Sequence, residues 1–196
     1  MKPRHLAAVL LLGCAGAFAA DKVPLPSSEE LAKLYSEDQA DRSGGPGAKI
    51  DWSAVSLRDE QRELRVKQLL AAGPLGGGEA YYHAAMVLQH ASEPDDYLLA
   101  HDLCVIAISK GEPKAKWLAA ASLDRYLISI ARPQRYGTQF RGTNNHPPHL
   151  APIDPTVSDT LRQELDVPTL AEARLKEADM VKFFEKAQAE KAKLAN

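Results

Sequence analysis

The sequence predicts an all-α fold: an antiparallel helical bundle with tetratricopeptide-like helix pairs and one long Pro-rich loop. Aromatic residues make up only 6% of the 196-residue chain, while Ala and Leu, which are strong helix formers, are abundant. Apolar residues recur at helical intervals through most of the chain after residue 27. Short connections in the central region predict antiparallel neighbours, and because no fixed-period repeat is present, a solenoid is not expected.

The boundaries of the helices follow from local start and stop signals. Ser27 and Glu30 have the spacing of a capping box, and Ser56 is expected to open a second helix in a similar way. Pro94 and Pro113 fit the first turns of two central helices. The expected helices are 27–39, 56–73, 79–91, 92–111, 113–132 and 168–193, with a shorter helical stretch from residue 158.

One segment between these helices is expected to be irregular. Residues 133–157 are rich in proline and show little apolar periodicity, so they are expected to cross the surface in an extended form. A long irregular segment in a compact domain is usually functional or disordered. Residues 21–196 are expected to form a single helical domain with its core at about 27–170.

The first twenty residues have the features of a secretory signal peptide. Lys2 and Arg4 precede an apolar run at 6–12, which is too short to span a bilayer, and small residues end the segment. Cleavage near Ala20 would release a soluble chain, whereas the residues before Cys14 resemble a bacterial lipobox and would give a lipoprotein. We therefore expect an exported protein, periplasmic or secreted, or one that is lipid-anchored through Cys14. A buried N-terminal helix is the third interpretation.

Charge and cysteine content narrow the classes of partner. Removal of residues 1–20 leaves 22 basic and 26 acidic residues, a net charge of −4. Without a basic stripe, no nucleic-acid partner is expected, and membrane contact is expected only if Cys14 is lipidated. Cys104 lies among apolar residues, which favours a small buried residue over a reactive thiol. The mature chain cannot form an intrachain disulfide, because Cys14 lies within the signal.

Four groups of polar residues differ from an ordinary surface. One lies late in an apolar helix, one interrupts another apolar helix, and one lies in the Pro-rich segment, where a rigid scaffold usually presents functional groups. The groups are Asp38, Asp41 and Arg42; Gln89 and His90; Asp124 and Arg125; and Gln134 to Gln139, which reads Gln-Arg-Tyr-Gly-Thr-Gln.

The loop motif resembles that of a bacterial protein family, domain of unknown function 6624, in which Gln-x-Tyr-Gly-Thr-Gln is the most recognisable mark. The Asp-Arg pair, the Gln-His pair and the acidic-and-arginine start at 38–42 also fit this family, as do Pro152, Asp154 and Arg162 after the loop. The resemblance covers roughly residues 27–170. It implies a helical fold and a shared polar centre, and it carries no established activity.

The helical groups are expected to converge. Helices 79–91 and 114–131 flank the helix between them, so their polar residues can share one groove. Asp124 is then expected to orient His90 through a carboxylate–imidazole hydrogen bond, which is sufficient for general acid–base chemistry. Arg42 and Arg125 offer planar guanidinium groups to a carboxylate or phosphate.

The loop is expected to add contacts to the same ligand. Gly137 allows a tight turn that brings backbone N–H groups close, and Thr138 is a conceivable nucleophile without an evident activating group. The expected catalytic residues are His90, Asp124 and Thr138, and the expected ligand-binding residues are Arg42, Gln89, Arg125, Gln134, Tyr136, Gly137 and Gln139.

Neither a metal nor a cofactor is expected. His83 and His90 stand two helical turns apart, about 10 Å, and cannot chelate one ion directly. The pair His146 and His149 lacks an acidic or cysteine cluster beside it. Nucleophile elbows, phosphate loops and dinucleotide-binding fingerprints are absent from the sequence.

Two functions remain open. In the first, the polar groove binds a small polar or anionic ligand and acts on it by acid–base hydrolysis. In the alternative, the protein is a periplasmic helical interaction module that binds a protein partner, and the polar residues only brace its helices. A site requires polar side chains that converge on a solvent-reachable pocket, whereas a brace leaves them paired and sealed.

Overall fold

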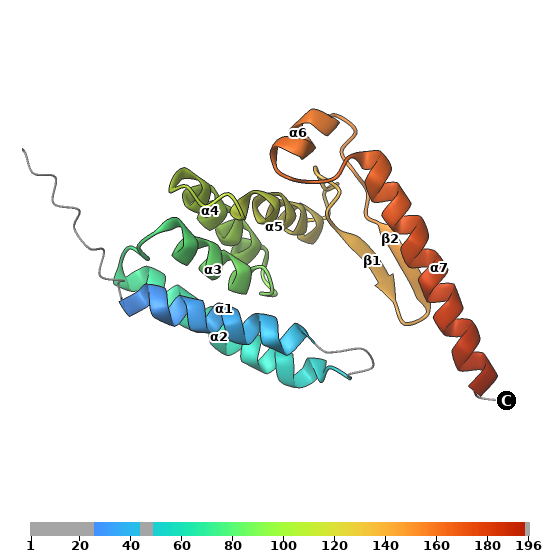
Figure 1. Ribbon diagram of the computed structural model, residues 1–196, viewed down its shortest axis with the longest axis horizontal. Coiled ribbons are helices and arrows are strands. Elements are labelled where there is room, and N and C mark those ends of the chain that lie inside the picture. The colour runs from blue at the N-terminus through green and yellow to red at the C-terminus, as the bar shows by residue number, and fades with distance from the viewer. Residues whose placement is uncertain (1–25, 44–48, 195–196) are drawn as a thin grey trace, which may run out of the picture.

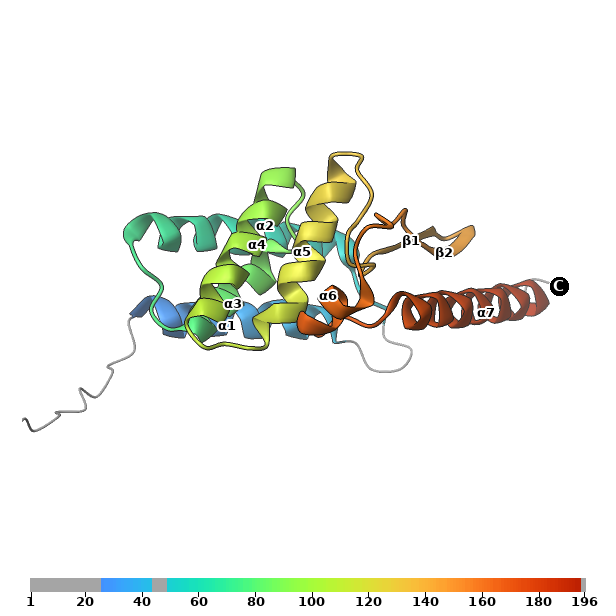
Figure 2. The same ribbon diagram turned by 90° about the horizontal axis from the view of Figure 1, so that it is seen from above.

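The computed structural model describes residues 26–43 and 49–194, which form a helical bundle with a small two-stranded sheet (Figure 1, Figure 2). The expected signal peptide, including Cys14, lies outside the described residues. The elements are α1 (Pro26–Arg42), α2 (Trp52–Ala72), α3 (Gly78–Leu88), α4 (Pro94–Ser109), α5 (Ala115–Ser129), β1 (Phe140–Thr143), β2 (His146–Leu150), α6 (Asp159–Glu164) and α7 (Leu170–Leu194). The predicted all-α class is confirmed.

The start of α2 differs from the prediction. This helix begins at Trp52, because the Asp51 carboxylate accepts hydrogen bonds from the backbone N–H groups of Ser53 and Ala54, both at 3.1 Å. An aspartate in this position satisfies N–H groups that have no partner within the helix. Ser56, the expected start, therefore lies inside the helix.

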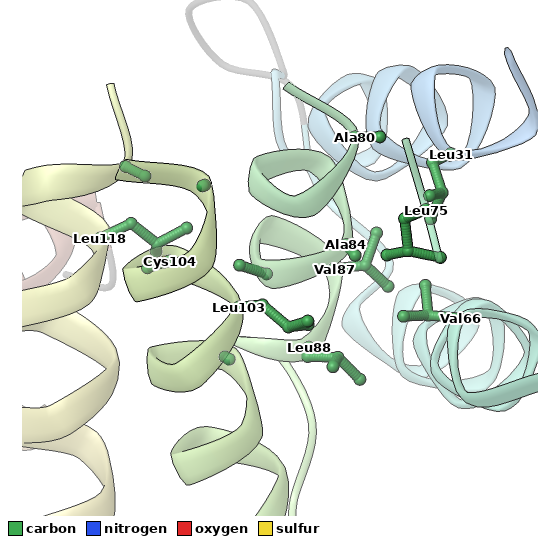
Figure 3. Packing of buried hydrophobic residues seen from close by; sticks show 14 of the residues in the cluster. Leu31, Val66, Leu75, Ala80, Ala84, Val87, Leu88, Leu103, Cys104 and Leu118 are labelled. Carbon is green, nitrogen blue, oxygen red and sulfur yellow. The ribbon is translucent and has the colours of Figure 1, made fainter. Parts of the chain in front are cut away.

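The core is formed where α3 packs against α1 and α2 on one side and against α4 on the other. Figure 3 shows Leu31 of α1, Val66 of α2 and Leu88 of α3 directed into this core, and all three are fully buried. Cys104 of α4 is buried as expected, and burial raises the pKa of its thiol to about 12. The bundle thus depends on apolar burial, at about 1.5–3 kcal/mol for each large aliphatic side chain.

A β-hairpin replaces part of the segment that was expected to be irregular. β1 and β2 pair antiparallel, with Phe140 opposite Leu150 and Thr143 opposite His146. β2 contains Pro147 and Pro148, which weaken the strand signal in the sequence. Proline is tolerated in this hairpin because both strands of a two-stranded sheet are edge strands, and the pairing is irregular between Arg141 and Thr143.

Helix α7 supports the hairpin at the end of the molecule opposite the start of α1 (Figure 2). Glu177 of α7 accepts a hydrogen bond of 2.9 Å from the backbone N–H of Leu150 in β2. Within the described part of the chain, no helix combines the length and the apolar character needed to span a membrane.

Candidate functional site

Asp124 holds the predicted functional loop through its backbone. The side chain is fully buried in α5, and its carboxylate accepts four hydrogen bonds. Oδ1 accepts from the backbone N–H groups of Arg135 (2.7 Å) and Tyr136 (3.0 Å). Oδ2 accepts from the N–H (3.0 Å) and the hydroxyl (2.8 Å) of Thr138. A carboxylate surrounded in this way fixes the conformation of the loop.

Gln134 braces the loop from inside. Its fully buried side-chain amide donates to the carbonyls of Gln139 (3.0 Å) and Ala151 (2.9 Å), and its side-chain oxygen accepts from the N–H of Gln139 (2.9 Å). Its backbone N–H and carbonyl bond to Pro152 and Asp154. Both amide N–H groups of Gln134 are therefore used within the protein.

Arg162 of α6 completes this brace and is also buried. Its Nε donates to the carbonyl of Tyr136 (3.1 Å), and its Nη2 donates to the carbonyl of Arg135 (3.4 Å). Its Nη1 donates to the carbonyl of Val157 (2.6 Å) and pairs with Asp159 (3.1 Å). The loop is thus held by the Asp124 anion on its N–H groups and by the Arg162 cation on its carbonyls.

These contacts correct the expected pairing of Asp124 with His90. The hydrogen bonds of the Asp124 carboxylate to other described residues all go to the loop, and the carboxylate beside His90 belongs to Asp38 of α1. Oδ2 of Asp38 lies 3.7 Å from Nε2 of His90. The reason is position: Asp124 faces the segment that follows α5, whereas His90 lies just beyond the end of α3, which packs against α1.

The surroundings of Asp38 and His90 raise the pKa of the carboxyl group and lower that of the imidazole. Burial raises the pKa of the fully buried Asp38 carboxyl, although the Arg42 guanidinium opposes the change. Burial, together with the positive charges of Arg42 and Arg125, lowers the pKa of His90 to about 3. Because the His90 side chain is 22% exposed, the imidazole connects the pair to solvent.

A network of ion pairs surrounds the pair at the junction of α1 and α2. Arg42 contacts Asp38 (2.8 Å) and Asp59 (2.6 Å), so this expected ligand-binding guanidinium is already paired with two carboxylates. Arg62 contacts Asp59 (2.6 Å) and Asp41 (2.8 Å). Its buried Nε has no hydrogen-bond partner among the residues described.

Arg125 is different, because its charge is not balanced by an ion pair. The guanidinium donates one hydrogen bond of 3.1 Å to the side-chain oxygen of Gln89 and contacts no carboxylate within residues 26–43 and 49–194. Burial lowers its pKa. Arg125 lines a cavity of about 180 Å³ together with Tyr97 of α4, Gln139 of the loop and Arg141 of β1. A largely buried cation facing a small cavity is suited to an anionic ligand.

The remaining loop residues face elsewhere. Gly137 has a φ of 83°, which confirms the tight turn expected of it. Gly137 and Thr138 line a separate cavity of about 480 Å³, and the hydrogen bonds described for Tyr136 involve only its backbone. The sequence-predicted residues are thus divided between the Asp38–His90 pair, the Arg125 cavity and the loop brace.

Four residues of these sites were not predicted from the sequence as site residues. Asp59 and Arg62 stand three apart in α2, a spacing at which opposite charges pair on one helix face, and this signal was available in the sequence. Tyr97 and Arg141 gave no such signal, because only the fold brings α4 and β1 to the same cavity. Over the described ranges, no three His, Cys, Asp or Glu side chains are grouped to hold a metal ion.

Comparison with family models, with curated proteins and with solved structures finds no match to this chain. The resemblance to domain of unknown function 6624 and the expected export of the chain therefore stay predictions.

Proposed function

We propose that this protein binds a small anionic ligand, through carboxylate or phosphate oxygens at Arg125, and hydrolyses it with Asp38 and His90 as an acid–base pair. The observation that carries the proposal is the Arg125 guanidinium, which lines a small cavity without a carboxylate partner in the described chain. Keeping a cation largely buried and unpaired is costly unless a ligand supplies the counter-charge.

The residues around Arg125 fit an oxyanion. Arg141 supplies a second guanidinium, and the phenol of Tyr97 supplies a neutral hydrogen-bond donor. The volume of about 180 Å³ is small, which favours a single carboxylate or phosphate group at the base of the cavity. Larger parts of a ligand would extend into solvent.

Ligand binding and proton transfer are coupled in this proposal. The positive charge of Arg125 helps to lower the pKa of His90, so an anion bound at Arg125 would return that pKa toward its ordinary value. His90 would then become a stronger base when the substrate is bound. His90 takes a proton from the attacking water and then gives it to the departing oxygen of the ligand, while the Asp38 carboxylate, 3.7 Å away, stabilises the imidazolium formed between these steps.

The alternative, an interaction module with structural polar residues, accounts for part of the molecule. Asp124, Gln134 and Arg162 are buried and mutually paired with the loop, as a brace requires. This alternative does not account for Arg125, whose guanidinium donates its described hydrogen bond to Gln89 alone. The ligand-binding function therefore has the stronger support.

Thermal unfolding in the presence of inorganic phosphate, acetate or succinate tests binding, with sodium chloride of equal ionic strength as the reference. The parent is expected to melt at a higher temperature with at least one of these anions, and Arg125→Gln is expected to lose this shift. Arg132→Gln is the matched control, because it removes the same charge from an exposed side chain. Equal stabilisation of all three proteins would refute the site.

Hydrolysis is tested separately with the p-nitrophenyl esters of phosphate and acetate. His90→Gln is expected to lower the rate by about 100-fold or more while anion binding at Arg125 remains. If His90→Gln hydrolyses both esters at the parent rate, the acid–base role is wrong, and the binding site stands alone.

A further inference from the structure

The 480 Å³ cavity beyond the loop has a chemistry different from that of the Arg125 cavity, with which it shares only Phe140 among its lining residues. Segments far apart in the sequence meet here: Trp117 of α5, Phe140 of β1, Asp166 after α6 and Lys176 of α7. Its volume lies within the range of cavities that hold small molecules. Asp124 and Arg162 hold the loop that forms one wall.

The wall of this cavity includes an aromatic surface with access to solvent. Trp117 is 42% exposed and lines the cavity. Val167 and Ala173 are buried and give the cavity an apolar floor. An exposed indole above an apolar floor offers a flat face for stacking.

Polar side chains with unused hydrogen-bonding capacity also line the cavity. The amide of Gln163, the carboxylate of Asp166 and the ammonium of Lys176 make no hydrogen bond or ion pair to any other residue that the structure describes. They provide acceptors and donors together. Glu172 is different, because Thr169 already donates its N–H (2.8 Å) and its hydroxyl (2.7 Å) to the Glu172 carboxylate.

The charges of the cavity argue against ionic ligands. One ammonium and two carboxylates line it, so an anion meets a net negative wall. A cation is disfavoured at the aromatic side, because Lys176 Nζ already lies 5.3 Å from the centroid of the Phe140 ring. A hydrocarbon chain would leave the polar groups of Gln163 and Asp166 without partners.

We propose that this cavity binds a neutral saccharide of one or two rings, with the C–H face of a ring against Trp117 and hydroxyl groups on Gln163, Asp166 and Lys176. A pyranose ring has one apolar face and a rim of hydroxyls that both donate and accept hydrogen bonds. This combination matches a flat aromatic surface bordered by a carboxylate, an amide and an ammonium. The proposal is independent of the anion site at Arg125.

Tryptophan emission reports this site directly, because the chain has only two tryptophans. In a Trp52→Phe background, Trp117 is the single source, and glucose, galactose, N-acetylglucosamine, cellobiose and maltose are titrated in turn. At least one of them is expected to change the emission saturably. Binding measured calorimetrically is expected to weaken about tenfold or more in Trp117→Ala and to be unchanged in Trp52→Phe.

Two further variants distinguish loss of the binding site from unfolding of the protein. Gln163→Ala and Asp166→Asn change exposed side chains, and asparagine tolerates the φ of 56° at position 166. Each is expected to weaken saccharide binding severalfold, while Arg125→Gln leaves it unchanged. The proposal is overturned if none of the five saccharides binds, or if Trp117→Ala binds them as tightly as the parent does.

Discussion

Asp38 of α1 places a carboxylate oxygen 3.7 Å from Nε2 of His90, which follows α3, and the two residues are 52 positions apart in the chain. Each of the two groups is in surroundings that disfavour its charged form. Pairs of titratable groups with displaced pKa values are concentrated at functional sites. This relationship is therefore the basis for the first prediction.

His90→Gln is expected to reduce the acid sensitivity of the folded protein. The unfolded chain protonates His90 below about pH 6.5, but the folded chain does so only near pH 3. The stability that depends on neutral His90 is thus fully present above pH 6.5 and is lost as the pH falls toward 3, by at most about 1.4 kcal/mol per pH unit. Urea unfolding of parent and variant between these pH values measures the difference.

Asp38 changes the stability of the folded protein with pH in the direction opposite to that of His90. Its raised pKa means that the folded chain binds a proton more readily than the unfolded chain, so its contribution to stability grows as the pH falls through the folded pKa. Because Asp38 is present in both the parent and His90→Gln, its contribution to stability cancels when the two proteins are compared. Identical pH profiles for parent and variant would show that His90 is not held neutral.

Asp124→Asn is expected to lower the free energy of unfolding by about 2–4 kcal/mol, because an amide retains only one acceptor oxygen for the four hydrogen bonds. Urea denaturation measures this change. Asp102→Asn is the matched control, since Asp102 is exposed on α4 and is expected to change stability by less than about 0.5 kcal/mol. A loss no larger than that of the control would contradict the brace.

Gly137→Ala is expected to destabilise the protein by about 1–2 kcal/mol. The backbone at position 137 has a φ of 83°, and a new Cβ would lie 3.4 Å from Cδ1 of Ile153. Gly77→Ala provides the comparison, because Gly77 has a φ of −75° and a Cβ there would meet no atom within 4 Å. Thermal unfolding should therefore separate the two variants, and equal melting temperatures would be inconsistent with strain at Gly137.

Asp51→Ala is expected to cost about 1 kcal/mol, because it removes the side-chain cap of α2. Ser56→Ala distinguishes the observed helix start from the one that the sequence predicted. Ser56 lies inside α2 with an exposed side chain, so its replacement is expected to change stability by less than about 0.5 kcal/mol. Chemical denaturation measures both changes. A larger loss of stability in Ser56→Ala than in Asp51→Ala would support the helix start that the sequence predicted.

The sequence determined the helical class, the central helices and the polar residues of interest. These properties depend on local spacing: apolar periodicity defines helix faces, and Pro94 has the first-turn position in α4 that the sequence predicted. Gly137 was also read correctly, because a glycine in a short polar loop commonly serves a positive φ. The hairpin was missed, because two prolines in β2 conceal the alternation by which a strand is recognised.

Which polar groups act together was decided only by the tertiary structure. Asp124 and His90 were expected to be partners because their helices flank a third helix, but packing directs Asp124 to the loop and brings Asp38 to His90. The sequence likewise could not show that Arg42 is paired and Arg125 is not. Local sequence fixes the side of a helix on which a residue lies, whereas the packing of helices against one another decides what that side meets.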